Sequence, residues 1–548
     1  MVQNSWNNYY SQKCQSREHS RPKASYPIVE SRVPVFFLQT RVDEIEISIP
    51  LLDYVTSKSV SVSEVRYYNE VKLYFQVTYI TVYPIKNPPI KKFRQIDISS
   101  NTALVADTQI LSLEYILENK LDNSSPRDIQ IFSLEIARKT LAHKNVTDLL
   151  EDSNEHFDVV LADLLETELY SGFAVLYNCP MIWIHSMGAN WQILKMIDVA
   201  TNPAYDPNYL SSNINPLSFI QRVEELWTRV EWQFFKTFFT QPEERRVYKS
   251  VFGPLLAKRR KILPNYDDII YNASLIFAND HDCTRNLPST PQNFKFIGGI
   301  HIEEPVKPLS HDIQDLINKS EHGVIYFSMG SFLKSFSMPK KLINEILQMF
   351  GKLKQTVIWK FEDSNWHGIP NNVHIIQWAP QQSILAHPNV KIFLTHGGLF
   401  SSIEAIHFGV PTIGIPVRFD QNTNVNKAVL NGYGLKVTLS YDLSKDLNTA
   451  INVMLNDDRY TKKAKVLSSI YHDRLTKPGP ALVYWVEYVV RTRGALHLRS
   501  PALHVPRYQR FYVDLLAVIL TIAAVLILLL FNLYKKTHVK RTDPKKIG

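Results

Sequence analysis

Short apolar runs alternate with helix-like segments between residues 323 and 431, and few folds accommodate this pattern. The helix-like segments cover residues 340–353, 401–408 and 424–431. The apolar runs, which read as buried strands, cover residues 323–331, 356–361, 373–380, 391–395 and 411–417. Apolar strands separated by helices predict a parallel, doubly wound α/β sheet. In such a sheet, ligands bind beyond the carboxyl ends of the strands.

The residues before this region show the same α/β character. Residues 75–84 carry alternating Val and Ile, and residues 157–163 form a short apolar run that ends in Asp163. With 548 residues, 45% of them hydrophobic, the chain is long and apolar enough for two or three packed domains. The Pro-rich passage 284–308 reads as a linker. We expect a polar, atypical N-terminus over 1–30, domains over 31–283 and 309–478, and a segment over 479–514 that returns to the first domain.

An uncharged apolar segment lies near the C-terminus, at residues 515–531. Extended to Tyr534, a helix of this length can span the ~30 Å hydrocarbon core of a bilayer. It also lacks the polar stripe of a soluble core helix. We therefore predict a transmembrane helix over 515–534. Six basic residues and one acidic residue follow over 535–548, so the tail is expected to be cytosolic and the body to lie across the membrane.

The last four residues, KKIG, favour the endoplasmic reticulum membrane. Lys545 and Lys546 stand where the dilysine retrieval signal has its lysines, although a plain solvated basic tail is the alternative. Four Asn-x-Ser/Thr triplets are compatible with a luminal body, and they begin at Asn123, Asn145, Asn272 and Asn318.

The N-terminus conflicts with a luminal body. Residues 1–23 contain no apolar run and therefore form no secretory signal peptide. We expect that the true start is missing from this sequence. A tail-anchored chain with its body in the cytosol is the alternative.

The charge and the cysteines exclude other classes of protein. Much of the net charge of +9 lies in the C-terminal tail, and no basic stripe is interleaved with aromatic residues, so nucleic acid is not an expected partner. Three cysteines, Cys14, Cys179 and Cys283, give neither a disulfide framework nor metal-ligand spacing.

The sequence His396-Gly397-Gly398 follows the expected strand 391–395 directly. The two glycines let backbone N–H groups approach an anion, and Ser401 or Ser402 can cap the next helix, whose N-terminus carries partial positive charge. With the donor of His396, these features predict a diphosphate cradle. Taken alone, the fragment also fits a Gly-rich turn with a buried histidine.

A longer motif surrounds this fragment. Its pattern is W-x-P-Q, H, F-x-T-H-G-G, S-x-x-E, G-V-P, P and D-Q, and it resembles the signature of the UDP-glycosyltransferases, a family that includes glucuronosyl- and glucosyltransferases. The matching residues are Trp378, Pro380, Gln381, His387, Phe393, Thr395, His396, Gly397, Gly398, Ser401, Glu404, Gly409, Val410, Pro411, Pro416, Asp420 and Gln421. The segments YFSMGS and THGGLFSSIEA are similar to membrane-bound animal members, insect ones above all.

The resemblance implies a GT-B fold, with two facing Rossmann-like domains and a C-terminal transmembrane helix. The first domain would bind a small lipophilic acceptor and the second a UDP-sugar, which is a co-substrate, so no cofactor is implied. No metal is implied either, because helix dipole and side-chain donors balance the leaving diphosphate. The sequence leaves homo- or hetero-oligomers open.

The family's roles fall on matching residues of the second domain. Trp378 would stack on uracil, Gln381 would lie near the base or ribose, and Glu404 would accept from the ribose hydroxyls. A core tryptophan at a strand end is the alternative for Trp378. The diphosphate would be held by Ser331, His396, Gly398 and Ser401. The sugar hydroxyls would be bound by Asp420 and Gln421, whose alternative role is to cap a turn.

The acceptor half departs from the family. Asp163 matches the carboxylate that orients the catalytic histidine, although it could simply cap a helix. The histidine itself is not found: His19 is the only one before His143, and no glycine occurs before Gly172. Residues 1–74 therefore resemble nothing in the family.

Three functions remain open from the sequence. The chain transfers glucose or glucuronic acid with inversion, as its family would, or it binds UDP-sugar but is catalytically impaired. The third is a non-enzymatic membrane-bound interaction protein, which the motif around His396 disfavours.

Overall fold

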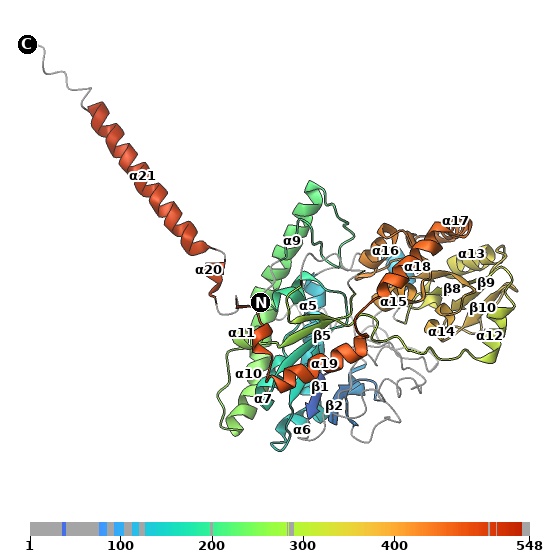
Figure 1. Ribbon diagram of the computed structural model, residues 1–548, viewed down its shortest axis with the longest axis horizontal. Helices are drawn as coiled ribbons and strands as arrows, with labels where there is room; N and C mark the ends of the chain where they lie inside the picture. Colours follow the sequence, from blue (N-terminus) through green and yellow to red (C-terminus); the bar gives the residue numbers. More distant parts are fainter. Residues whose placement is uncertain are drawn as a thin grey trace, which may run out of the picture.

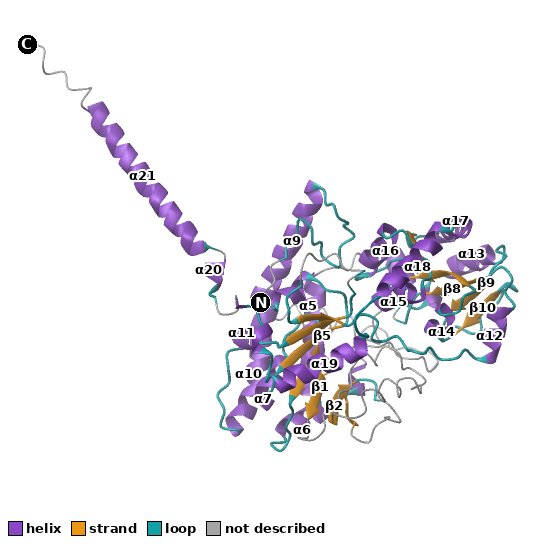
Figure 2. Ribbon diagram, in the orientation of Figure 1, coloured by secondary structure: helices purple, strands orange, loops and turns teal. Residues whose placement is uncertain are grey.

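A computed structural model describes the chain over residues 35–39, 76–84, 93–102, 112–119, 126–197, 201–281, 283, 290–331, 333–501, 505–510 and 512–539. The polar N-terminus 1–30, Asn123 and the dilysine pair lie outside the described residues. Figure 1 shows two α/β bodies side by side and one long helix, α21, that extends away from them. Figure 2 shows that each body has its own sheet, flanked by helices.

The first body is built on a seven-stranded sheet with the order β3-β2-β1-β4-β5-β6-β7. Strand β1 runs antiparallel to both of its neighbours, β2 and β4, while the other described pairs in this sheet are parallel. One strand of the expected parallel sheet is thus reversed. The strands are β1 (Val35–Gln39), β2 (Gln76–Thr81), β3 (Phe93–Asp97), β4 (Val159–Asp163), β5 (Met181–His185), β6 (Leu275–Ala278) and β7 (Phe294–Phe296).

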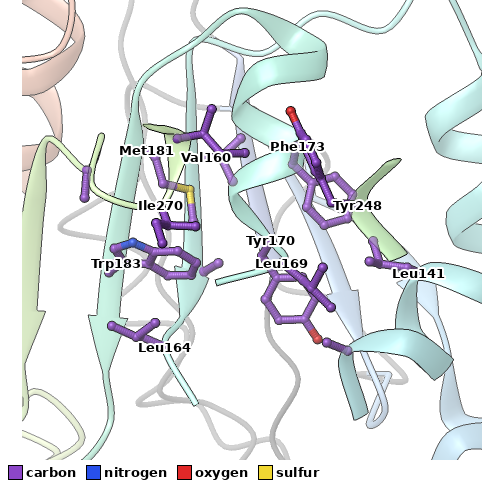
Figure 3. Close-up of a cluster of buried hydrophobic side chains, with 14 of the residues drawn as sticks. Leu141, Val160, Leu164, Leu169, Tyr170, Phe173, Met181, Trp183, Tyr248 and Ile270 are labelled. Atoms are coloured by element: carbon purple, nitrogen blue, oxygen red, sulfur yellow. The ribbon is translucent and has the colours of Figure 1, made fainter. Parts of the chain in front are cut away.

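The two faces of the first sheet are covered separately, because alternate residues of a strand point to opposite sides. Val160 of β4 packs with α7 (Ser171–Tyr177) and α10 (Gln241–Lys258), in the core of Figure 3, where Trp183, Phe173 and Tyr248 also lie. Leu161 packs on the other face against α19 (Pro478–Arg491). The C-terminal segment therefore covers the first sheet after the second domain is complete.

The passage read as a linker contains part of the first sheet. Strand β7 pairs in parallel with β6 and carries the buried Phe294. The prediction that the first domain ends at residue 283 is therefore too short. Prolines around this segment suggested an irregular passage, but three residues with two phenylalanines are enough for an edge strand.

The second body is a six-stranded sheet with the order β10-β9-β8-β11-β12-β13, in which every pair is parallel. This confirms the predicted parallel sheet. Its strands are β8 (Val324–Ser328), β9 (Thr356–Lys360), β10 (Val373–Ile376), β11 (Val390–Thr395), β12 (Thr412–Gly414) and β13 (Gly434–Lys436). Its main helices are α13 (Lys340–Phe350), α14 (Gln381–Leu385), α15 (Leu399–Phe408), α16 (Gln421–Leu430), α17 (Leu443–Asn456) and α18 (Arg459–His472).

The last described helix is α21 (Val513–Val539). Its segment Val513–Lys536 has a mean hydropathy of 3.0 over 18 residues, and none of that stretch is buried against the protein. An apolar helix of 24 residues can cross a bilayer. The helix begins before and ends after the predicted span 515–534.

Candidate functional site

The predicted anion cradle lies where β11 ends and α15 begins. Gly397 has φ +82, and a side chain there would meet Val425, since an added Cβ would lie 2.3 Å from Cγ2. Gly398 is the N-cap of α15, so Ser401 lies inside the first turn. The prediction that Ser401 or Ser402 caps this helix is wrong. The helix starts earlier because the turn is made by the glycines themselves.

His396 is wedged between two glycines. An added Cβ on Gly330 or on Gly398 would lie 2.5 Å from the His396 ring. Burial and, to a smaller extent, the positive charge of Lys360 lower the pKa of His396 to about 4. His396 is therefore neutral at neutral pH. It can donate one N–H to an anion, but it brings no positive charge.

Glu404 lies one turn along α15 from Ser401, and its buried carboxylate contacts two glutamine side chains. Its Oε2 accepts a hydrogen bond of 2.6 Å from Gln381 Nε2, and its Oε1 accepts one of 3.0 Å from Gln382 Nε2. Gln381 Nε2 also lies 3.1 Å from Ser401 Oγ. Burial raises the pKa of Glu404 to about 7, against the opposing hydrogen bonds from Gln381 and Gln382. The carboxylate can thus exchange these partners for ligand hydroxyls.

Trp378 stands between β10 and α14, with 42% of its surface exposed. A core tryptophan, the alternative read from the sequence, is therefore ruled out. Lys360, at the end of β9, places its Nζ 5.4 Å from the centre of the indole and donates to the carbonyl oxygen of Gly330 at 2.8 Å. An exposed indole beside a cation suits a flat ligand that carries negative charge.

Asp420 and Gln421 lie at the start of α16. Gln421 Oε1 accepts from the backbone N–H groups of Val417 and Arg418, so it braces the preceding loop as a turn cap. Asp420 Oδ2 accepts from Asn424 Nδ2 at 2.9 Å, and the same amide donates to Gly397 O at 3.0 Å. Asn424 thereby ties the Asp420 turn to the glycine turn.

Ser331 follows the end of β8 and is partly exposed; its carbonyl oxygen accepts from Lys334 Nζ at 3.0 Å. The structure thus brings the predicted residues of the second domain to the carboxyl end of one sheet. Asp163 is separate from them, because it ends β4 in the first sheet, where it is 6% exposed. It does not cap α7, the next helix in the described part of the chain, which begins only at Ser171 with Tyr170 as its N-cap.

The first domain touches the second beside Asp420. Thr423 Oγ1 of α16 donates to the backbone carbonyls of Tyr209 and Ser211, at 2.8 and 2.9 Å. Asn426 Nδ2 donates to Ser212 O at 2.9 Å. A loop of the first domain therefore borders the predicted sugar subsite.

Three residues near the site were not predicted from the sequence. Gln382 holds Glu404, Lys360 lies beside Trp378, and His301 Nε2 lies 3.5 Å from Glu404 Oε1. The sequence could have indicated two of them, because Gln382 directly follows Gln381 and Lys360 is a charged residue at the end of an apolar strand. His301 comes from the passage between the domains and gave no signal.

One histidine–carboxylate group among the described residues lies close enough together to consider a metal ion. It consists of Glu304, His407 and His472, whose ligand atoms lie within 4.8 Å of one another. Lys477 already forms an ion pair with Glu304. Because a lysine occupies the position of a cation, the group is better described as an ion-paired cluster. The expectation that the reaction needs no metal stays a prediction.

Comparisons with known proteins show similarity over most of the chain, including the motif around His396. The family model for UDP-glucoronosyl and UDP-glucosyl transferase matches residues 94–546. The chain is 31% identical over 451 residues to UDP-glucosyltransferase 2 of Dactylopius coccus, covering 81% of this chain and 84% of that protein. It is 31% identical over 424 residues to UDP-glucuronosyltransferase 2B15 of Rattus norvegicus, covering 76% of each. The solved structure of the calicheamicin glycosyltransferase CalG4 shares 14% identity, with a TM-score of 0.48, over 73% of this chain and 86% of that one.

Proposed function

Because the chain belongs to the family of UDP-glucuronosyl and UDP-glucosyl transferases, we propose that it moves glucose or glucuronic acid from a UDP-sugar to a hydroxyl of a small lipophilic acceptor, with inversion. The observation that carries the proposal is the convergence of Trp378, Glu404 and His396 at one sheet edge. The family and the apolar helix α21 together indicate a single-pass membrane protein. The endoplasmic reticulum and a luminal body remain part of the proposal.

The uridine would lie along Trp378, whose exposed face supplies stacking area. Gln381 would turn toward the base or the ribose, and Glu404 would accept the two ribose hydroxyls. Binding would then replace the hydrogen bonds that now join these side chains. The exchange suits a buried carboxylate, since the hydroxyls restore the hydrogen bonds that it loses.

The diphosphate would lie at the N-terminus of α15, held by His396, the Gly398 turn, Ser401 and Ser331. Neutral His396 contributes a hydrogen bond, and the helix dipole contributes partial positive charge. Lys360, whose ammonium group pairs with Glu362 at 2.9 Å, lies beside Trp378 and Gly330. Asp420 and Gln421 would bind the sugar hydroxyls, with Gln421 also keeping its loop in place.

Transfer with inversion has one chemical requirement. The acceptor hydroxyl loses its proton and attacks the anomeric carbon, and the bond from that carbon to the UDP oxygen breaks on the opposite side. Asp163 would orient the base that takes the proton. His185, at the end of neighbouring β5, is unsuitable as that base, because it is buried and both ring nitrogens contact protein groups, Leu164 O and Asn190 Nδ2.

The reversed strand β1 favours a second candidate, a UDP-sugar-binding member with impaired catalysis. In a parallel strand at this central position, the following loop would open at the same edge as Asp163. Strand β1 is antiparallel to β4, so its carboxyl end at Gln39 lies at the opposite edge. Losing a general base typically costs about 10²–10⁴-fold in rate.

Calorimetry with UDP and a transfer assay separate these candidates. The full-length protein in detergent should release heat with UDP, and Trp378→Ala and His396→Ala should weaken that binding. Trp366→Ala is the control, because Trp366 lies in the same domain and packs on Phe361. Heat without transfer from UDP-glucose or UDP-glucuronate to a phenol would favour the impaired candidate. Absence of heat with a folded protein would refute both.

A further inference from the structure

Helix α9 (Phe219–Phe235) is amphipathic, but its apolar side faces outward. Among its residues, Glu225 and Trp232 are buried. The exposed large side chains recur every three or four positions, the period of a helix, and continue into the π-helical turn Lys236–Thr240. This "α9 face" consists of Phe219, Ile220, Val223, Leu226, Trp227, Val230, Phe234, Phe238 and Phe239, each between 51% and 73% exposed.

Polar contacts on the inner side fix this orientation. Glu225 accepts from Asn208 N at 2.7 Å and from Asn213 Nδ2 at 2.8 Å. Arg229 pairs with Asp206, with 3.2 Å between Nη2 and Oδ2. Rotating α9 to bury its apolar side would expose or break these bonds. The outward apolar side is therefore a stable property of the fold.

The α9 face is larger than what isolated soluble domains usually expose. Nine contiguous large apolar residues, five of them aromatic, form a stripe along about five helical turns. Figure 1 shows α9 at the margin of the first body, on the side from which α21 departs. In this view the α9 face and the membrane helix α21 thus lie on the same side of the first body.

We propose that the α9 face lies in the interfacial layer of the bilayer that α21 spans. Aromatic and aliphatic side chains on one face of a helix suit the boundary between headgroups and acyl chains. The tether through α21 keeps the first domain near that surface, so weak interfacial binding is enough. Arg222 and Arg229 are balanced by Glu224, Glu225 and Glu231 within α9, so uncharged lipids serve as well as anionic ones.

This placement bears on access to the active site. The inner side of α9 binds the loop that carries Asn208 and Asn213, and carbonyls of the same loop contact α16 beside Asp420. A lipophilic compound dissolved in the bilayer would therefore meet the protein close to the border between its two domains. The surface proposal stands without the proposed transfer reaction, because its test measures lipid contact.

The test uses the full-length protein in phosphatidylcholine vesicles. Val230→Cys, in the middle of the α9 face, is labelled with an environment-sensitive fluorophore, and Asp312→Cys on α12 (His311–Asn318) is the matched exposed control. Unmodified protein, labelled in parallel, gives the background from its own cysteines. A quencher attached high on the lipid acyl chain should quench the probe at position 230 and spare the one at 312.

A second pair of variants separates the face from the tether. Trp227→Glu with Phe234→Glu should abolish quenching at position 230, while Ile262→Glu with Leu475→Glu, exposed apolar residues elsewhere, should leave it unchanged. Retained UDP binding and circular dichroism would show that the variants fold. The Trp227→Glu with Phe234→Glu variant should lose quenching to the same extent in zwitterionic and in anionic vesicles, because the α9 face needs no anionic lipid.

Two results would overturn the proposal. A probe at 230 that lipid quenchers do not reach, although it is shielded from water, means that another segment of the chain covers the α9 face. Disulfide-linked dimers formed by unlabelled Val230→Cys, again without lipid quenching, mean that a second copy covers it.

Discussion

The two sheets are both well buried, but they differ in the direction of one strand. In the second sheet every strand is parallel, and the predicted donor residues gather at the single edge where the strands end. In the first sheet β1 is reversed at a central position, between β2 and β4. Packing does not reveal this, because β4 and β8 are buried along their whole length in both domains. A sheet can therefore be well packed while one of its central strands ends at the edge opposite to Asp163.

The largest expected effect tests the first sheet. Asp163→Asn should lower kcat by about 10²–10⁴-fold, because the base loses the carboxylate that orients it, while UDP affinity stays unchanged. Initial rates with a phenolic acceptor, together with UDP calorimetry, check both halves of this expectation. An unchanged kcat in an active enzyme would remove Asp163 from the mechanism. If the unmodified protein already shows no transfer above background, the result would favour the impaired candidate, which the reversed strand β1 suggests.

The next effect concerns the glycine turn of the second sheet. Gly397→Val should lower the free energy of unfolding by about 2–4 kcal/mol, through left-handed strain and the clash with Val425. It should also weaken UDP binding. Gly368→Val is the matched control: φ is +76, but no atom lies within 4 Å of its added Cβ. Denaturant melts that destabilise both equally would show that space around Gly397 is irrelevant.

A smaller effect is expected from Glu404. Removing a buried acceptor of two ligand hydroxyls, as in Glu404→Ala, should weaken UDP binding by about 10–100-fold, from the ~1.5–3 kcal/mol of charged hydrogen bonds. Glu345→Ala is the control, since Glu345 pairs with Lys341 on α13 and has no predicted ligand contact. Calorimetry with UDP and with uracil would locate the loss on the ribose. Equal loss for both compounds would argue against that contact.

The smallest effect is a dependence of UDP binding on pH. The pKa of Glu404 is raised to about 7 by burial, so a growing share of the free protein carries a neutral carboxyl as the pH falls from 8 to 6. UDP affinity should fall by up to about tenfold over this range. The pKa of His396 is about 4, so His396 stays neutral throughout and adds nothing. Glu404→Gln should flatten the profile; a slope that persists would assign the titration elsewhere.

The second domain was predictable because the alternation of strands and helices and the binding motif fall on the same residues. The strand expected over 391–395 is β11, and the helix expected over 401–408 is α15, which starts two residues earlier. Its start was misplaced because serines are common caps, while here Gly398 forms the turn. Gln382 follows the predicted Gln381, and Lys360 lies inside the strand predicted over 356–361. Their roles were missed because side-chain direction depends on packing that a single sequence does not show.

The first domain was less predictable for a physical reason. Apolar residues indicate that a segment is a strand, but strand direction depends on the connections to its neighbours, which the sequence around Val35–Gln39 does not specify. The same limit applies to α9, whose helical period is evident while the side that faces the solvent is not. There, the decisive contacts come from Asp206 and Asn208 in the preceding loop.

Beside Asp420, the two domains contribute different chemical groups to their contact. There the second domain contributes the side chains of Thr423 and Asn426, and the first contributes carbonyl oxygens of the main chain at 209, 211 and 212. Every residue type offers such a carbonyl. Side chains of this loop can therefore change during evolution while these contacts between the two domains are kept.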